Sequence, residues 1–437
     1  MRILKSFNVL TGPYGPEHHS LQGHAGSLHL FIHNSWEKLM EYIGTADEAY
    51  VVFDAGPARG LETVFDMYPG LSNVTGLQYY PLRTHVLSRP VDYNRLSPLV
   101  RAIYHDLIAH FAATGTPVAG ADHIVWSDEV GAVFAQHPGL DLCPFQFTPK
   151  MRVIRDDPRW LEVVSLYEHK GRLADLWQGQ GFTPPSVAVY GQSRKEAALD
   201  ASAVWEYLGK RPGRLKLAYG ASGDQQPKFR ALSQLKKLLK DLAWQDVDFV
   251  IQRDVGQVEI SVNYYIDGAG KLYCLFTTLQ QIEDSKHVGN IEDYTYEHAA
   301  RAITDVMARD ALDRGMKGFF GFDLMVDRRT GRVWVIECNA RVTAPVYGWI
   351  LARKHGVARF GVATVKGVQG NTIVDALHPS LWYSKTQGKG IIVFNPGPIP
   401  LGEYQGAALA PTQEGVIKLL ADAKQTATAP IARVSFA

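Results

Sequence analysis

The sequence predicts an α/β protein built from several lobes. Its 437 residues exceed what one ordinary hydrophobic core can hold, so two to four domains or lobes are expected. Strand-like apolar runs alternate with amphipathic helical stretches along most of the chain. Hydrophobic residues make up 46% and charged residues 20% of the chain, a globular composition that excludes a disordered chain, collagen and a coiled coil.

Charge and cysteine content narrow the class of protein further. The net charge of +1 gives no bulk field that would draw the protein onto nucleic acid or a membrane. No apolar run approaches the roughly 18 residues of a spanning helix, and the first ten residues lack the apolar core of a signal peptide. Three scattered cysteines are too few for a disulfide framework or a zinc site. We therefore expect a cytoplasmic protein with no nucleic-acid or membrane partner.

Residues 1–160 predict an α/β lobe, with a strand over 48–53 and a helix over 96–113. This region is rich in histidine, with His18, His19, His24, His29 and His33. Of these, His29 and His33 would share a helix face. No acidic residue or cysteine follows at a ligand-like spacing, so solvated histidines are favoured over a metal site.

From residue 161 the pattern becomes sharper, because Gly and Pro separate well-defined periodic segments. In order, it predicts a helix over 168–178, an extended stretch from 183, a strand over 214–218, an amphipathic helix over 229–242, strands over 248–252, 257–266 and 271–278, a helix over 296–314, and strands over 319–326 and 332–338. The remaining tail predicts only a strand over 390–394 and a helix over 413–423.

The most informative segment spans residues 321–341. Side chains alternate along a strand, so Glu337 and Asn339 should point to the same face and offer two hard oxygen ligands of the kind that Mg2+ accepts. If the turn is 329–331, Arg328 pairs with Arg332 and Asp323 stands opposite Glu337; a longer turn makes them diagonal neighbours. Two facing carboxylates without a cation would repel each other, which favours a metal site over a solvated hairpin.

The other face of the second of these strands predicts packing rather than chemistry. Cys338 should lie opposite to Glu337, and Trp334 and Ile336 should share its face and enter the core.

A second candidate site precedes this hairpin. Lys216 ends a strand and is followed by a small-residue turn, so one ammonium and several backbone N–H groups could surround phosphate oxygens there. The turn residues that would take part are Gly220, Ser222 and Gly223. Glu259 alternates with Val258 and Ile260 and should face away from their core side, where it could accept ribose hydroxyls or simply be a surface residue.

The order of these elements over residues 165–345 resembles the ATP-grasp superfamily, whose pattern is two lysines, a small-residue loop, a hinge, a ribose-binding glutamate and a closing Glu-x-Asn. The helix at 170–184 is similar to that of D-alanine–D-alanine ligase-type members, although Gly321 stands where those ligases have an arginine. The resemblance implies that ATP binds at Lys170, Lys216, Gln252 and Glu259, that Asp323, Glu337 and Asn339 hold Mg2+ or Mn2+, and that Arg341 contacts a substrate carboxylate or acyl phosphate.

The resemblance also implies a three-part organisation: a pre-ATP-grasp α/β domain over 1–160, a central lobe over 161–265, and a C-terminal lobe with an extension over 266–437. The implied reaction moves the γ-phosphoryl group of ATP onto a carboxylate, and an amine then displaces phosphate. His287, in a polar loop expected over 280–290, could orient or deprotonate the amine, or belong to an ordinary surface loop.

The overall plan is similar to that of peptide ligases of natural-product and antibiotic pathways, such as the pheganomycin-type group. The expected substrates are therefore a small-molecule carboxylate and the amine of an amino acid or peptide. A homodimer is expected only because many relatives are dimers. A kinase-like phosphotransferase and a nucleotide-binding regulator without turnover are the alternatives. A biotin-dependent carboxylase is disfavoured because nothing resembles a biotinylated lysine motif.

Overall fold

A computed structural model describes residues 43–63, 77–191, 199–219, 226–242, 247–283 and 286–428. Residues 43–437 form the second of two units into which the chain divides, and the description below concerns this unit. The five N-terminal histidines lie outside the described residues, as do Gly220, Ser222 and Gly223 of the predicted phosphate turn.

The first part of the second unit has a four-stranded parallel sheet in the order β3-β2-β1-β4. Its strands are β1 (Arg59–Glu62), β2 (Tyr93–Leu96), β3 (Ile124–Trp126) and β4 (Asp141–Pro144). The helices are α2 (Ala46–Ala55), α3 (Arg101–Thr114) and α4 (Ala132–Gln136), with the 3-10 helices η3 (Leu77–Leu87), η4 (Pro98–Val100), η5 (Ala121–His123) and η6 (Pro149–Val153). The α/β character predicted for this region is therefore confirmed.

The strand predicted over residues 48–53 is wrong, because this segment lies in helix α2. Thr45 and Glu48 form a capping box: the Thr45 hydroxyl accepts from the Glu48 N–H, and the Glu48 carboxylate accepts from the Thr45 N–H at 2.8 Å. This start signal outweighs the strand propensity of the β-branched and aromatic residues that follow it.

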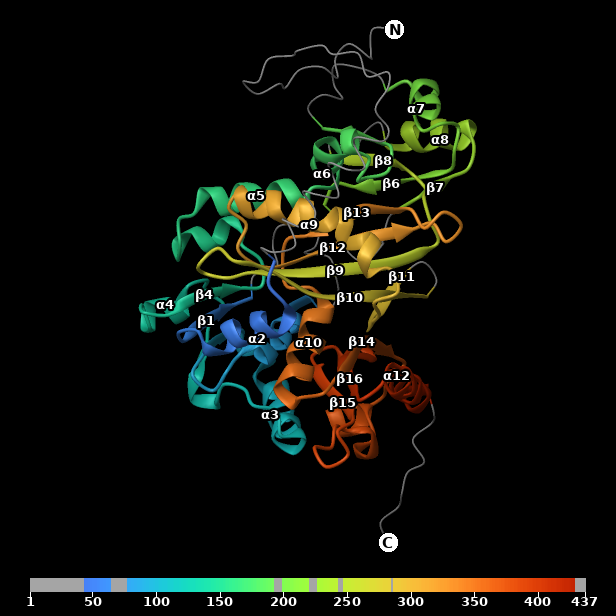
Figure 1. The fold of residues 1–437 in the computed structure, drawn as a ribbon. Coiled ribbons are helices and arrows are strands. Elements are labelled where there is room, and N and C mark those ends of the chain that lie inside the picture. Colours follow the sequence, from blue (N-terminus) through green and yellow to red (C-terminus); the bar gives the residue numbers. More distant parts are fainter. Residues whose placement is uncertain are drawn as a thin grey trace. The chain divides into compact units, whose positions relative to one another are not determined.

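A second, antiparallel sheet of four strands has the order β5-β8-β6-β7. It consists of β5 (Ser186–Val189), β6 (Gly213–Leu217), β7 (Lys228–Phe229) and β8 (Phe249–Arg253). The neighbouring helices are α5 (Pro158–Glu168), α6 (Lys170–Trp177), η7 (Gln178–Gln180), α7 (Ala201–Tyr207) and α8 (Leu232–Leu242). Figure 1 shows α7 and α8 together beside β6 and β7.

The largest sheet has eight antiparallel strands in the order β13-β12-β9-β10-β11-β14-β16-β15. The strands are β9 (Val258–Ile266), β10 (Leu272–Glu283), β11 (Lys286–Glu292), β12 (Gly318–Val326), β13 (Val333–Asn339), β14 (Arg359–Lys366), β15 (Gly390–Asn395) and β16 (Glu403–Ala410). Its helices are α9 (Glu297–Asp313), α10 (Ala344–His355), α11 (Ile373–Ala376) and α12 (Gln413–Thr428), with the 3-10 turns η9 (Pro379–Leu381) and η10 (Ile399–Leu401).

The structure of this sheet differs from the sequence-based predictions in three places. The polar loop predicted over 280–290 is wrong, because the β10–β11 hairpin occupies it and pairs Gln280 with Asn290. The tail beyond residue 345 contributes β14, β16 and α10 in addition to the predicted strand and helix. The chain passes from the second sheet to the third at residues 254–257, so the predicted division at 265/266 falls within β9. The division into domains otherwise remains a prediction.

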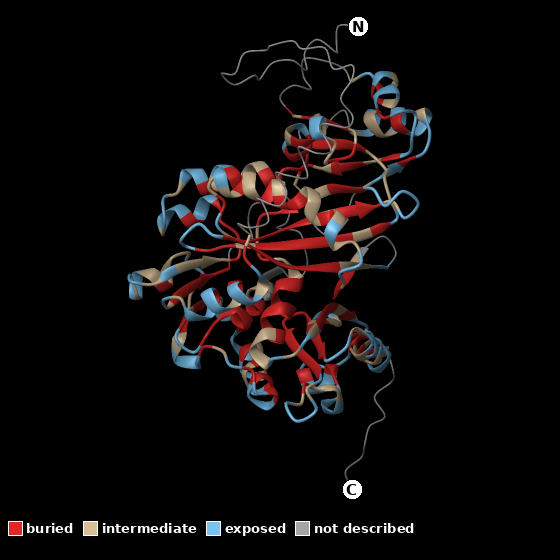
Figure 2. Ribbon diagram, viewed as in Figure 1, coloured by how far each residue is buried: buried red, intermediate tan, exposed pale blue. Residues whose placement is uncertain are grey.

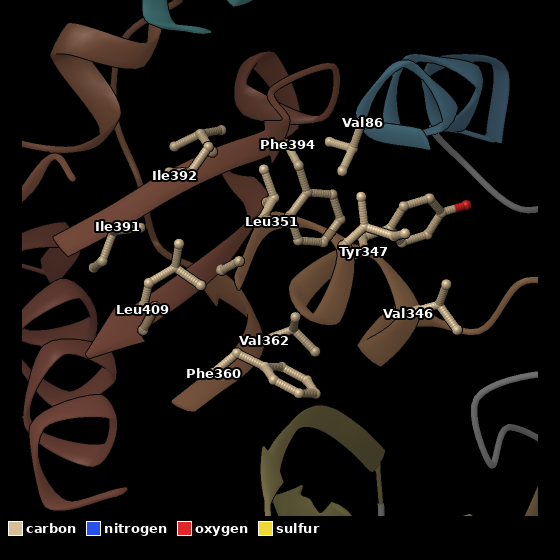
Figure 3. Close-up of a cluster of buried hydrophobic side chains, with 14 of the residues drawn as sticks. Val86, Val346, Tyr347, Leu351, Phe360, Val362, Ile391, Ile392, Phe394 and Leu409 are labelled. Carbon is tan, nitrogen blue, oxygen red and sulfur yellow. The ribbon is translucent and has the colours of Figure 1, made fainter. Parts of the chain in front are cut away.

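The largest apolar core joins the first sheet's helices to the C-terminal part of the large sheet. Figure 3 shows ten labelled members of this cluster, in which Tyr347 of α10 stacks on Phe394 of β15 at 5.3 Å between ring centroids. Fully burying an aliphatic or aromatic side chain stabilises the fold by about 1.5–3 kcal/mol. The extension after residue 345 is therefore an integral part of the folded core.

The strands of the large sheet are mostly buried, whereas helices such as α2 and α12 keep an exposed side (Figure 2). None of the helices within the described residues is long and apolar enough to cross a lipid bilayer.

Candidate functional site

The hairpin β12–β13 carries the predicted metal ligands, and its register places Asp323 directly opposite Glu337. The adjacent pair joins Leu324 to Val335, so Ile336 is an extra residue that forms a β-bulge. The predicted pairing of the two carboxylates is therefore confirmed, and the bulge lies immediately beside it.

The turn that closes this hairpin differs from the predicted one. The Asp327 N–H donates to the Arg332 carbonyl at 2.9 Å, and the Gly331 N–H donates to the Asp327 carbonyl at 2.8 Å. The predicted pairing of Arg328 with Arg332 is therefore wrong by one residue. The bulge restores the register before Asp323 is reached.

The bulge also changes which side chains of β13 enter the core. Cys338 packs in the core with Val333 and Val335, as the alternation from Glu337 predicts. Trp334 and Ile336 were expected on the face of Cys338 and in the core. The face is wrong for both, because Ile336 is the extra residue and inverts the alternation, but Trp334 is buried as expected, at 6% exposure. Ile336 instead lines the cleft described below.

Asp323, Glu337 and Asn339 converge at one face of the large sheet. Asn339 Nδ2 donates to one Asp323 oxygen at 2.9 Å, and Gln280 Nε2 donates to the other at 2.7 Å. Burial and the facing Glu337 carboxylate raise the pKa of Asp323 to about 7. Holding two carboxylates together in a buried place costs electrostatic free energy. A divalent cation bound between them would offset this cost.

The donor set fits Mg2+ better than a softer metal. Within the described residues there is no group of three or more His, Cys, Asp and Glu side chains that could hold a metal. The candidate site therefore depends on the amide oxygen of Asn339 as its third ligand. Carboxylate and amide oxygens are the ligands that Mg2+ and Mn2+ prefer.

Two buried lysines approach this face from the second sheet and its helices. Lys170 begins α6, is 5% exposed, and places Nζ 3.1 Å from Glu337 Oε1. Lys216 lies on β6 and is 2% exposed. Burial, with the nearby Arg214 guanidinium, lowers the pKa of Lys216 to about 8. Both ammonium groups lie beside the face that carries Asp323 and Glu337, where they could contact a polyanion.

A small cleft separates the second sheet from the large sheet. Its lining comes from β6, β8, the 254–257 connection, β12 and β13: Arg214, Lys216, Gln252, Arg253, Asp254, Val255, Met325 and Ile336. Gln252 Nε2 donates to the Ser186 hydroxyl at 3.1 Å, so its side chain already has a partner in the second sheet. Glu259 pairs with Met325 and is only partly buried, whereas Val258 and Ile260 pack in the core. The cleft thus brings Lys216, Gln252 and the predicted hinge together, with Glu259 beside one lining residue.

A chain of hydrogen bonds crosses the same face beneath these residues. It runs from His287 Nε2 to Asn290 Oδ1 (2.7 Å), from Asn290 Nδ2 to the Thr278 hydroxyl (2.9 Å), and on through Ser261 and Asn263 to Thr343. Because Asn290 donates through its nitrogen to Thr278, its oxygen accepts from His287 Nε2–H, which leaves Nδ1 of the ring as the acceptor. Burial lowers the pKa of His287, so the neutral ring is favoured.

Arg341 follows the metal-ligand pair and is held by a second carboxylate. Its Nη1 donates to both oxygens of Glu168, at 2.8 and 3.0 Å. Glu168 is 2% exposed and ends helix α5, two residues before Lys170. The α5–α6 junction therefore supplies partners to both Arg341 and Glu337.

Gly321 has a steric role in this arrangement. A Cβ at this position would lie 2.6 Å from Asn263 Oδ1, closer than any real Cβ contact. An arginine here would disrupt the polar chain, so the site has no room for the arginine that D-alanine–D-alanine ligases have at this position.

Several residues of the site were not predicted. Glu168, Gln280 and Asn263 are ordinary polar residues in sequence, and only the sheet order brings them to Arg341 and Asp323. The one available signal was the alternation of polar and apolar residues in β9, which places Ser261 and Asn263 on the Glu259 face.

Comparison with known proteins identifies the class of this fold. Residues 211–345 match the family model described as the ATP-grasp domain, so the chain contains an ATP-grasp domain. No curated protein matches the sequence.

Similar solved structures include N5-carboxyaminoimidazole synthetase from Staphylococcus aureus, with a TM-score of 0.53, 8% identity, and coverage of 85% of this chain and 98% of that chain. A biotin carboxylase–ATP complex from Campylobacter jejuni has a TM-score of 0.53 and 12% identity over 85% of this chain and 91% of that chain. Carboxyaminoimidazole ribonucleotide synthase from Aspergillus clavatus, complexed with ATP, has a TM-score of 0.52 and 12% identity over 85% and 98%. At these identities the likeness shows a shared ATP-grasp fold.

Proposed function

We propose that this protein is an ATP-dependent ligase that joins a carboxylate to an amine. The observation that carries the proposal is the convergence of Asp323, Glu337 and Asn339 on one sheet face, with Lys170 paired to Glu337 and Lys216 in the adjoining cleft. The matching domain model and the ATP-grasp fold of the described residues support it.

The proposed reaction begins with phosphoryl transfer. A carboxylate oxygen of the substrate attacks the γ-phosphorus of ATP, ADP leaves, and a mixed carboxylic–phosphoric anhydride forms. Asp323, Glu337 and Asn339 would hold Mg2+, which supplies neutralisation of triphosphate charge when it is bound. The flexible side chain of Lys170 can swing from Glu337 to a phosphate oxygen, and Lys216 lines the adjoining cleft.

The second step forms the amide bond. The amine nitrogen attacks the acyl carbon, the C–O bond to phosphate breaks, and inorganic phosphate leaves. The nitrogen loses a proton, which Nδ1 of His287 can accept because Asn290 holds the other ring nitrogen as the donor. Arg341 would orient the acyl group through its guanidinium, which Glu168 holds in place.

The finer proposal is that the amine belongs to an amino acid or peptide and that the product is a peptide-type bond of a natural-product pathway. It is supported by the resemblance in the order of the motifs.

The direct test is phosphate release from ATP with a panel of carboxylic acids and amines, offered singly and in pairs. Release that requires both an acid and an amine, with an amide product in the mass spectrum, is the expected result. A stable phosphorylated acceptor would instead identify a kinase-like enzyme. Nucleotide binding without turnover would identify a regulatory protein.

A further inference from the structure

The carboxylate of Asp323 is held by a side chain that comes from two strands away. In the large sheet Asp323 pairs with Ser261 of β9, and Ser261 pairs with Thr278 of β10. Gln280 lies two residues beyond Thr278, so its side chain projects from the same face as Asp323. Its Nε2 donates to Asp323 Oδ1 at 2.7 Å. The side chain of Gln280 therefore reaches across β9 to a predicted metal ligand.

The other oxygen of Asp323 also accepts from an amide. Asn339 Nδ2 donates to Asp323 Oδ2 at 2.9 Å. Each oxygen thus accepts one N–H, and the two hydrogen bonds together fix the direction in which the carboxylate points. A carboxylate oxygen has two lone pairs, so each oxygen keeps one lone pair for a cation.

These contacts also determine how the two amides are turned. An ionised carboxylate can only accept hydrogen bonds, so Gln280 and Asn339 must both present their NH2 groups to Asp323. The amide oxygen of Asn339 is on the other branch of its side chain and is turned away from Asp323. This oxygen is the one that would bind the ion. Gln280, Asp323 and Asn339 therefore form one chain of contacts that ends at a ligand oxygen.

Gln280 extends from a backbone that is fixed on both sides. Strand β10 pairs with β9 on one side and with β11 on the other. On the β11 side Gln280 pairs with Asn290, the hydrogen-bond partner of His287. A side chain that is held by a paired strand is placed more precisely than one on a loop. The β10–β11 hairpin thus gives Gln280 a defined position relative to the candidate metal ligands.

We propose that Gln280 is a positioning residue of the metal site, which orients the Asp323 carboxylate and, through it, the Asn339 amide toward the ion that accompanies the nucleotide. The inference rests on the proposed function for the presence of that ion. Carboxylates that bind metals are usually held by hydrogen bonds from residues outside the ligand set. Removal of such a partner typically weakens metal binding by about 10- to 100-fold.

The test is a titration of Mn2+, used as a probe for Mg2+, into the ADP-saturated full chain, with bound Mn2+ measured by the relaxation of water protons. Q280M keeps the length of the side chain but has no donor, so its Mn2+ affinity should be about 10- to 100-fold weaker than that of the wild type. Q281M is the matched control, because Gln281 is the next residue of β10, is also partly buried and projects from the opposite face. It should bind Mn2+ as the wild type does. Equal affinity in Q280M and the wild type, or an equal loss in Q281M, would overturn the proposal.

Melting temperatures separate positioning from a purely structural role. Mn2+ should raise the melting temperature of the ADP-saturated wild type above its value in EDTA, because the ion stabilises the folded protein that binds it. In Q280M this rise should be smaller, whereas the affinity for ADP without metal should equal that of the wild type. A melting temperature that falls equally with Mn2+ and with EDTA would show a structural role and contradict the proposal.

A double variant tests whether Gln280 acts through Asp323. D323A removes the carboxylate, so D323A and D323A/Q280M should bind Mn2+ with the same weakened affinity. A further loss in the double variant would place the effect of Gln280 elsewhere and reject its assignment as a positioning residue.

Failure of this inference can be told apart from failure of the ligase proposal. Weaker Mn2+ binding in Q280M but not in Q281M, with no release of phosphate from ATP in the wild type, would support the positioning role and overturn the ligase function. Acid- and amine-dependent release of phosphate in which Q280M leaves the KM for Mg2+ unchanged would support the ligase and overturn the role of Gln280.

Discussion

Strands β9 and β12 have one apolar face and one mostly polar face. One face is apolar and packs in the core beneath α5 and α9, with members Val258, Ile260, Val262, Tyr264, Phe320, Phe322, Leu324 and Val326. The other carries Glu259, Ser261, Asn263, Gly321, Asp323 and Met325. Successive side chains of a strand point to opposite faces, so alternate residues of the same two strands form the core and the candidate site. Substitutions on the two faces should therefore affect different measurements.

The largest effect is expected on the apolar face. Phe322 is fully buried, and F322A should lower the free energy of unfolding by about 3–5 kcal/mol because it leaves a cavity in the core. Urea unfolding measures this change. A loss below about 1 kcal/mol would mean that the apolar face contributes little to stability.

The neighbouring residue should show the opposite behaviour. D323N relieves the repulsion from Glu337 but turns an NH2 group toward one of the two amide donors, Asn339 or Gln280. These effects oppose each other, so the free energy of unfolding should change by less than about 2 kcal/mol, whereas turnover should fall by about 10²- to 10³-fold. Phosphate release and urea unfolding of the same preparation give both values. Full turnover in D323N would contradict the assignment of this face.

A smaller and more selective effect is expected at Arg341. R341K keeps the charge opposite Glu168 but loses the planar fork, so KM for the carboxylic acid should rise about tenfold while the affinity for ADP stays unchanged. R359K is the matched control, because Arg359 of β14 pairs with the buried carboxylate of Glu292 in β11. Equal losses for the acid and for ADP would place Arg341 outside the acid site.

The smallest effect is a pH dependence at Lys216. Its pKa lies at about 8 instead of the ordinary 10.5, because burial and Arg214 oppose its charge. ADP affinity should therefore fall as the pH rises through about 8, since the ammonium is lost. Between about pH 8 and 10.5 the unfolded chain holds a proton that the folded chain has released, so this lysine should make the free energy of unfolding rise with pH. K216M should remove both trends, and trends that persist in this variant would have another origin.

The sequence predicted those parts of the fold in which local pattern and tertiary structure agree. Strands over 213–217 and 318–326 and the helix over 297–313 were all expected within a few residues, because alternation, Gly turns and caps mark them. The helix α2 was mistaken for a strand although its capping box stands in the sequence at Thr45 and Glu48. The β10–β11 hairpin was mistaken for a loop because its polar residues face the site instead of solvent.

The site was predictable in part for the same reason. The facing pair of Asp323 and Glu337 follows from hairpin register, which is a local property. The contact of Arg341 with Glu168 joins residues 173 positions apart, and the approach of Gln280 to Asp323 crosses an intervening strand. No spacing in the sequence encodes such contacts, because they depend on the order of strands in the sheet.

The most direct test of the account is the binding of a divalent cation together with nucleotide. Calorimetric titration of Mn2+, used as a probe for Mg2+, into the ADP-saturated protein should show one site in the wild type. In E337Q its affinity should be at least about tenfold weaker, with ADP affinity in the absence of metal equal or higher, because Lys170 loses its carboxylate partner. E414Q, which alters an exposed glutamate in α12, should bind as the wild type does. Equal Mn2+ affinity in E337Q and the wild type would contradict the claim that Asp323, Glu337 and Asn339 hold the ion.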